Sequence, residues 1–306
     1  MIRWRWVGGV LLAGSITGAT ACGSGAAPAP VARRDLVPSW PDVFDGVPDL
    51  YGVIRPRALK RDGIYGAFWN ALLRAAQARG FTRGSTMVEA AEGAEEIIAG
   101  LNRGADAALI FRGVAASLDP ASMHDADGHP LFRAVNERGK VAEYALIDRK
   151  SADGSLFVLP DRTWVGALGE ARGRARQAFA APLSRPPPAI DPQALAAVRV
   201  AGPLTRAYDR HPILGLLTRK LASATFTLLP GKGGLVVELL YTDEDAVARA
   251  EMNAKRIVAE LSKSEARAWL RDAKVDYQGR TVVVRMALPP RLLEELPSAS
   301  GADLSL

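Results

Sequence analysis

A run of prolines divides this chain more sharply than any other feature of its sequence. Pro186, Pro187 and Pro188 are consecutive, and Pro192 follows shortly after them. Proline lacks a backbone N–H and holds φ near −65°, so such a run favours an extended spacer over a helix or a central strand. At roughly 100–200 residues per domain, a chain of 306 residues has room for a folded unit on each side. We therefore expect residues 185–193 to link a module at 47–184 to a second module at 194–296, with a flexible tail at 297–306.

Hydrophobic periodicity predicts the elements of the first module. Apolar residues recur at i, i+4 and i+8 over 64–79, which is typical of an amphipathic helix, and 87–101 is expected to form a second helix. Asp153-Gly154 is a hairpin signal between two apolar runs. The expected strands are 50–54, 107–111, 144–148 and 155–159, and the last helix is 170–180.

The second module is expected to repeat this order more compactly. Gly231, Gly233 and Gly234 lie between two runs that alternate between apolar and polar residues, as in a hairpin. Asp243, Glu244 and Asp245 precede a long apolar stripe and complement a helix N-terminus. The expected strands are 198–200, 224–229, 235–241, 275–277 and 281–286. The expected helices are 213–221, a long helix from 242 or 243 to 261, a helix from a capping box at Ser262–Glu265 to 273, and 292–296. This order predicts an α+β fold with two modules, mostly antiparallel sheets and helices packed on one face.

The N-terminal residues have the pattern of an export signal. Arg3 and Arg5 precede a short run of small and apolar residues that ends in Ala19-Thr20-Ala21, directly before Cys22. A basic start, a short apolar stretch and small residues before a cut describe a secretory signal at 1–21. Cys22 is the chain's only cysteine, so no intramolecular disulfide can form. Residues 22–46 begin with Gly, Ser, Ala and Pro and are expected to form a tether.

Two processing outcomes follow from these residues. In the first, Cys22 is lipidated after cleavage and anchors the chain in a bilayer, because its position is the one that such processing uses. In the second, an ordinary signal peptidase cuts after Ala-x-Ala, and the protein is soluble, either secreted or periplasmic. Lipidation is the favoured outcome.

The chain resembles predicted envelope lipoproteins of myxobacterial-type Gram-negative bacteria. The residues that carry the resemblance are the signal ending at Cys22, the opening run 49–53 and the segment 159–166. Ala19 departs from the leucine that is usual three positions before the lipidated cysteine. The resemblance implies two α+β modules behind an anchored cysteine and no known activity. Gly23, in place of aspartate after the cysteine, favours the outer membrane, facing the periplasm.

One short segment has the composition of a metal site. His124, Asp125, Asp127 and His129 lie within six positions, and imidazole and carboxylate groups are common metal ligands. Gly128 and Pro130, however, are turn residues that argue against a helix. A polar turn is therefore the favoured interpretation, and a metal site is the alternative.

Other catalytic and cofactor motifs are missing from the sequence. No nucleophile elbow, phosphate loop or dinucleotide fingerprint occurs, so we expect no cofactor. Thirty-nine basic residues against thirty-three acidic ones give a net charge of +6. The basic residues are dispersed: Arg172, Arg174 and Arg176 spread around a helix, whereas nucleic-acid binders cluster their charge with stacking aromatics. We expect no nucleic-acid partner.

These observations favour a lipid-anchored cell-envelope protein that binds or scaffolds an unidentified envelope protein or ligand without catalysis. The alternative is a periplasm-facing hydrolase or metalloprotein that uses the segment His124–His129.

Overall fold

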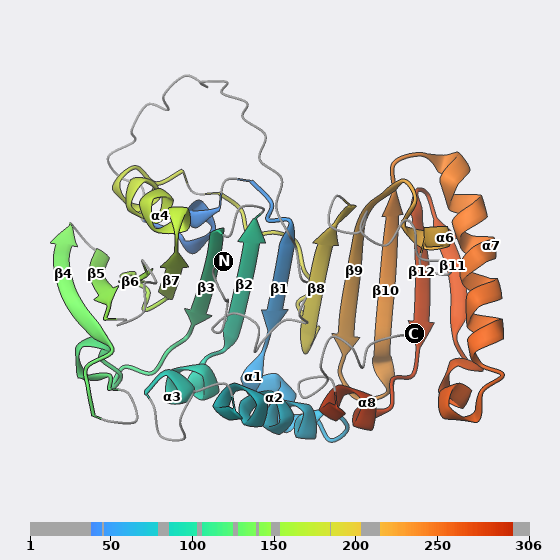
Figure 1. Ribbon diagram of the computed structural model, residues 1–306, viewed down its shortest axis with the longest axis horizontal. Helices are drawn as coiled ribbons and strands as arrows, with labels where there is room; N and C mark the ends of the chain where they lie inside the picture. The colour runs from blue at the N-terminus through green and yellow to red at the C-terminus, as the bar shows by residue number, and fades with distance from the viewer. Residues whose placement is uncertain are drawn as a thin grey trace.

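One continuous antiparallel sheet forms the centre of the protein (Figure 1). The computed structural model describes residues 38–44, 46–78, 86–102, 106–124, 128–138, 141–147, 154–183, 185–202 and 215–295. Within them, twelve strands pair in the order β11-β12-β10-β9-β8-β1-β2-β3-β7-β6-β5-β4. The seven strands of the first half are β1 (Leu50–Ile54), β2 (Glu96–Asn102), β3 (Asp106–Arg112), β4 (Phe132–Arg138), β5 (Val141–Leu146), β6 (Gly154–Val158) and β7 (Trp164–Leu168). The five strands of the second half are β8 (Ala196–Ala201), β9 (Leu221–Leu229), β10 (Gly234–Tyr241), β11 (Lys274–Gln278) and β12 (Thr281–Met286).

Strands from both sides of the proline run meet in this sheet. β1 pairs with β8 over five positions, from Leu50↔Val200 to Ile54↔Ala196. Arg55, directly after β1, holds the entrance to β8, because its guanidinium donates hydrogen bonds to the carbonyl oxygens of Asp191 at 2.9 Å and of Ala194 at 2.5 Å. The two predicted modules therefore share one backbone hydrogen-bond network.

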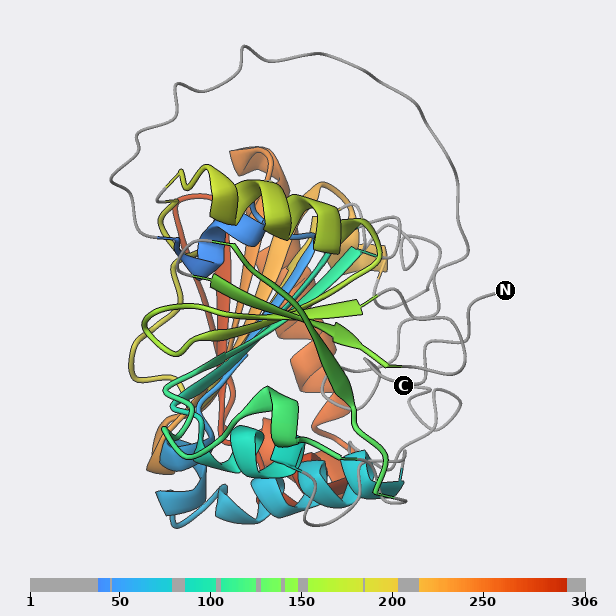
Figure 2. The same cartoon turned by 90° about the vertical axis from the view of Figure 1, so that its left-hand side faces the viewer.

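The helices cover the sheet from two sides. In the first half, helix α4 (Glu170–Ala180) and the 3-10 helix η1 (Trp40–Val43) lie on one side, and α1 (Pro56–Arg61), α2 (Gly66–Ala78) and α3 (Thr86–Gly93) lie on the other (Figure 2). α8 (Pro290–Glu295) packs against α2. In the second half, α7 (Glu244–Leu261) packs on β10, β11 and β12, and the short α6 (Gly215–Thr218) contacts α7. The α+β class and the antiparallel pairing are confirmed, while the helices contact both sides of the sheet rather than one.

Strand alternation builds a separate core on each face. Tyr51 and Val53 of β1 join the cluster beneath α4, whereas Ile54 joins the cluster of α1, α2 and α3. Successive side chains in a strand point to opposite faces, so one strand serves both cores. A third cluster, under α7, contains Val247, Ala250 and Ala254 of the helix together with buried valines of β11 and β12.

One predicted helix of the first module is wrong. The expected helix at 87–101 is the helix α3, which ends at Gly93, followed by the strand β2, which begins at Glu96. Ile97 and Ile98 lie on opposite faces of the sheet and fill different clusters. A short apolar run of this kind fits either period, so the sequence alone does not separate the two outcomes.

Smaller differences follow from tertiary pairing. β4 and β7 were not expected, and Leu221, expected at the end of a helix, begins β9. The helix expected to follow a capping box at Ser262 is the 3-10 helix η5 (Glu265–Leu270), whose N-cap is Ser264, while Ser262 is the C-cap of α7. Among the described helices, none has both the length and the apolar character needed to cross a membrane.

Candidate functional site

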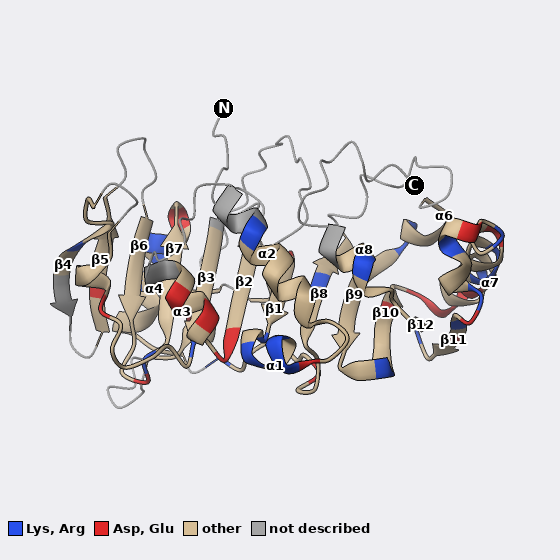
Figure 3. Cartoon of the chain, turned by 90° about the horizontal axis from the view of Figure 1, so that it is seen from below, with Lys and Arg blue, Asp and Glu red and all other residues tan. Residues whose placement is uncertain are grey.

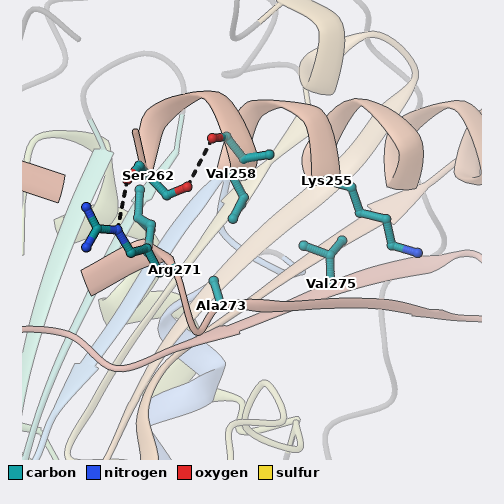
Figure 4. A pocket seen from close by; sticks show the side chains of 8 residues that line it. Lys255, Val258, Ser262, Arg271, Ala273 and Val275 are labelled. Atoms are coloured by element: carbon teal, nitrogen blue, oxygen red, sulfur yellow. Dashed lines mark hydrogen bonds between the residues drawn. The ribbon is translucent and has the colours of Figure 1, made fainter. Parts of the chain in front are cut away.

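A groove opens between α7 and the last strand of the sheet (Figure 4). Its volume is about 340 Å³. Val258, Leu270, Ala273 and Val275 give it an apolar floor and walls. The remaining lining residues are Lys255, Ala259, Ser262 and Arg271. Because β11 is the outermost strand at its end of the sheet, this groove lies at a sheet edge.

Local sequence explains how the groove is built. The carboxylate of Asp243 accepts a hydrogen bond from the N–H of Ala246 at 2.8 Å and thereby caps α7. The helix buries its alanine and valine stripe against the sheet and ends at Leu261. η5 then turns the chain back, with Leu270 buried, so that β11 returns beneath the second half of α7.

Two cations stand at opposite ends of the groove, Lys255 on α7 and Arg271 beyond η5 (Figure 4). Lys255 Nζ lies 2.8 Å from the Glu251 carboxylate, and this hydrogen bond raises the pKa of the lysine. The Arg271 guanidinium lies 2.6 Å from the carboxylate of Glu265, whose side chain is 87% exposed. Surface pairs of this kind contribute little to stability and exchange partners readily. The groove therefore offers an apolar centre with a cationic side chain at each end, each one paired with a surface carboxylate.

The His124–His129 segment forms a turn on the surface. His124 pairs with Pro130 in an isolated antiparallel β-bridge, and its Nδ1 lies 2.6 Å from the carbonyl oxygen of Ser122. Both histidines are exposed, while the neighbouring Met123 is fully buried. Asp125 and Asp127 lie outside the described residues, as does Cys22. Within the part of the chain that the structure describes, no group of three or more potential metal ligands occurs.

Sequence reasoning missed a buried ionic cluster on the opposite side of the molecule. Glu143 of β5 has a side chain only 8% exposed. Its carboxylate accepts hydrogen bonds from Arg176 at 2.6 Å and from the Ser155 hydroxyl at 2.8 Å, and Arg172 lies 3.7 Å away. The two arginines looked like solvated helix surface because their partner is distant in sequence. The cluster joins α4 to the sheet through a buried carboxylate and two partly exposed arginines, so we assign it a structural role.

A second ionic cluster contains Arg55, Glu96 and Arg112. Arg55 Nε lies 2.9 Å from one oxygen of the Glu96 carboxylate, and Arg112 binds the other oxygen. Because Arg55 also holds the segment before β8, the cluster fixes the junction between the two halves of the sheet.

Comparison with known proteins gives a match of fold alone. No family model matches this sequence, and no curated protein matches it. The chain is similar to two solved structures described as crystal forms I and IV of TP0453, with sequence identities of 10% and 8%. The TM-scores are 0.51 and 0.52, and the alignments cover 84% of this chain and 95% and 96% of those chains. At such low identity the similarity concerns the arrangement of helices and strands, and this α+β arrangement is what the chain shares with them.

Proposed function

We propose that this protein is a lipid-anchored component of the cell envelope that binds a partner without catalysing a reaction. The observation that carries this proposal is Cys22. It is the chain's only cysteine, and it follows a basic start, a short apolar run and Ala19-Thr20-Ala21. These features occur in the order found in a lipoprotein signal, with Ala19 in place of the usual leucine, and several acyl chains on one residue give firm anchoring. The resemblance to myxobacterial-type envelope lipoproteins supports the same assignment, and Gly23 favours the outer membrane.

The body is suited to presentation from such an anchor. The described chain enters the body at η1, where Trp40, Val43 and Phe44 are buried against α4 and the sheet. The ring of Phe44 lies so close to Gly100 of β2 that a side-chain carbon there would overlap it. This docking gives the anchored end a firm attachment to the first half of the sheet, while the α7–β11 groove lies in the other half (Figure 1). We assign partner binding to that groove.

Intact mass of the mature N-terminus and membrane fractionation test the anchor. We expect a mature chain that begins at Cys22, carries acyl groups and sediments with membranes. Cys22→Ser is the matched control, and it should release the protein into the soluble fraction without changing its thermal stability, because Cys22 precedes all the described helices and strands in the sequence. A mature wild-type chain that is unmodified and soluble would contradict the proposal.

The alternative function is a metalloprotein that uses His124 and His129. The observation in its favour is the β-bridge between His124 and Pro130, which holds the two exposed histidines in one turn. Metal analysis of the purified chain separates the two functions. A bound metal that is lost on combined His124→Ala and His129→Ala substitution supports the alternative, and the same low metal content in both proteins removes it.

A further inference from the structure

We propose that the free edge of β11 and the adjacent groove receive an extended polypeptide segment, which adds to the sheet as a further strand beneath α7. This inference rests on the proposed binding function and names the class of its partner.

The hairpin geometry determines which backbone groups of β11 are available. Gln278 and Thr281 flank a two-residue turn and are paired, so they form a hydrogen-bonded pair. Hydrogen-bonded pairs alternate along an antiparallel ladder, so Asp276 and Lys274 also bond to β12. Val275 and Tyr277 therefore direct their N–H and C=O groups away from β12. Within the described residues, β11 has no strand on that side.

The side chains of β11 leave its outer edge open to pairing with a further strand. Val275 and Tyr277 lie on the α7 side of the sheet, in register with Val284 and Val282, which belong to the core beneath α7. Tyr277 is 59% exposed although it points to that side. Lys274 and Asp276 point to the other face and leave the groove unobstructed. Alternate side chains of an added strand would face the groove, and its volume of about 340 Å³ suits small apolar residues.

The cationic side chains at the ends of the groove favour an acidic residue in the bound segment. Lys255 and Arg271 line the groove, and each is paired with a carboxylate at the surface. A carboxylate on the partner, positioned by the new strand, can replace Glu265 beside Arg271 and form a bidentate contact. The partner is therefore an extended segment with alternating apolar residues and an acidic residue at one end.

The opposite edge of the sheet lacks these properties. β4 is the outermost strand there, and its pairing with β5 is interrupted by an irregularity between Ala134 and Asn136. Bulges of this kind disrupt the ladder and discourage further pairing. The β11–β12 pairing has no such interruption over its five positions.

The position of α7 argues against a second copy of this chain as the partner. α7 lies at the outer end of the sheet beside β11 in two perpendicular views (Figures 1 and 3). In a continuous sheet made by two β11 edges, two such helices would have to lie side by side on the same face, above two strands only about 4.8 Å apart. Packed helices need 8–10 Å between their axes. A partner strand without its own covering helix avoids this conflict.

The test uses a display library of random peptides of about nine residues, selected on the mature full-length chain in detergent micelles. We expect enriched peptides to alternate small apolar residues with polar ones and to carry Asp or Glu. Tyr277→Pro removes an outward N–H without breaking a bond to β12 and should weaken binding of these peptides by about tenfold. Tyr277→Ala keeps that N–H and is the matched control, which should retain most of the affinity.

Two further measurements keep the test decisive if Tyr277→Pro fails to fold. Peptides N-methylated at alternate residues should bind in one methylation register and fail in the other. Hydrogen exchange at the amides of Val275 and Tyr277 should slow when peptide is added. The proposal is overturned by the absence of enriched peptides, by enriched peptides without alternation, or by methylation in either register having the same effect.

A chain that binds such peptides but carries no lipid would contradict the anchor alone, and a lipidated chain that binds none would contradict this inference alone.

Discussion

Glu143 lies in β5 on the face that α4 covers, and its environment decides whether it remains charged. Burial by itself raises the pKa of this carboxyl group, but the hydrogen bonds from Arg176 and Ser155 and the charge of Arg172 outweigh it. The net result is a pKa below the ordinary value for glutamate. A carboxylate with a lowered folded-state pKa stabilises the protein above its unfolded pKa, and this contribution is lost as the pH falls through the folded pKa.

Glu143→Gln should therefore make the unfolding free energy less dependent on pH in the acidic range. We expect the variant to lose about 2 kcal/mol of unfolding free energy at pH 7, because the two half-buried arginines lose the charge of the buried carboxylate with which they pair. Below about pH 4.3, where an unperturbed glutamate protonates, the difference between variant and wild type should shrink. Urea unfolding across the pH range measures both effects.

Glu260→Gln is the matched control for this substitution. Glu260 pairs with Lys263 at 2.6 Å on the surface, where both side chains are 69% exposed. Its substitution should leave the unfolding free energy nearly unchanged at every pH. Equal effects of the two substitutions would show that the buried Glu143 carboxylate contributes no more to stability than the surface Glu260 carboxylate does.

At the scale of single elements, two glycines show why local conformation needs the structure. Gly173 lies inside helix α4, and a side-chain carbon there meets nothing within 4 Å. Gly279 begins the turn between β11 and β12 with a φ of +54°, a region that residues with a side chain rarely adopt. The sequence shows only that both are glycines, whereas the structure shows that Gly279 alone has a backbone conformation that requires glycine.

Alanine at these positions should have opposite effects. Gly173→Ala should stabilise the protein by about 0.5–1 kcal/mol, because alanine loses less backbone entropy in a helix. Gly279→Ala should destabilise it by about 1–2 kcal/mol, because the turn then holds alanine in a left-handed conformation. Shifts of the urea midpoint at unchanged m-value measure both, and effects of the same sign would contradict these backbone assignments.

Elements with a clear period were predictable, and short apolar runs were not. The helix at 170–180 coincides with α4, and α7 begins at Glu244, one residue after the later of its two predicted starts, 242 and 243. The run that contains Ile97, Ile98 and Leu101 forms a strand because β1 and β3 pair with it on both sides. These partners lie outside the local window on which a periodicity argument depends.

At the scale of the whole molecule, the sheet crosses the boundary that the prolines suggest. β1 is paired with β2 on one side and β8 on the other, so removing either half would leave a central strand with an unpaired edge. Asp62, in the first half, also accepts a hydrogen bond from the N–H of Gly231 in the second half at 2.7 Å. These links favour folding of both halves as one unit.

We therefore expect one cooperative unfolding transition. Hydrogen exchange followed by mass spectrometry in increasing urea should give coincident midpoints for peptides from β3 and from β10, one from each half. Two separate midpoints would indicate that the modules at 47–184 and 194–296 fold independently, as the sequence division suggests.

The candidate site could not be predicted from the sequence, because its residues come from separate elements of the chain. Lys255 and Arg271 lie on separate elements and no motif singles them out, and the sequence predicts 275–277 only as a strand of a hairpin. Only the return of β11 beneath α7 brings Lys255, Arg271 and Val275 to one groove. The His124–His129 segment, by contrast, was visible because its residues are neighbours in sequence.

The sequence by itself determined the properties that depend on local order. These are the α+β class, the turns and most helices, because each arises from residues within a short window. The export signal with Cys22 at its end is predicted from the same kind of local order and stays a prediction. The tertiary structure decided which strands are neighbours, that one sheet spans the proline run, and that no strand among the described residues pairs with the outer edge of β11, beside the groove. Pairing between distant strands depends on the packing of the whole chain, and no local pattern of residues contains it.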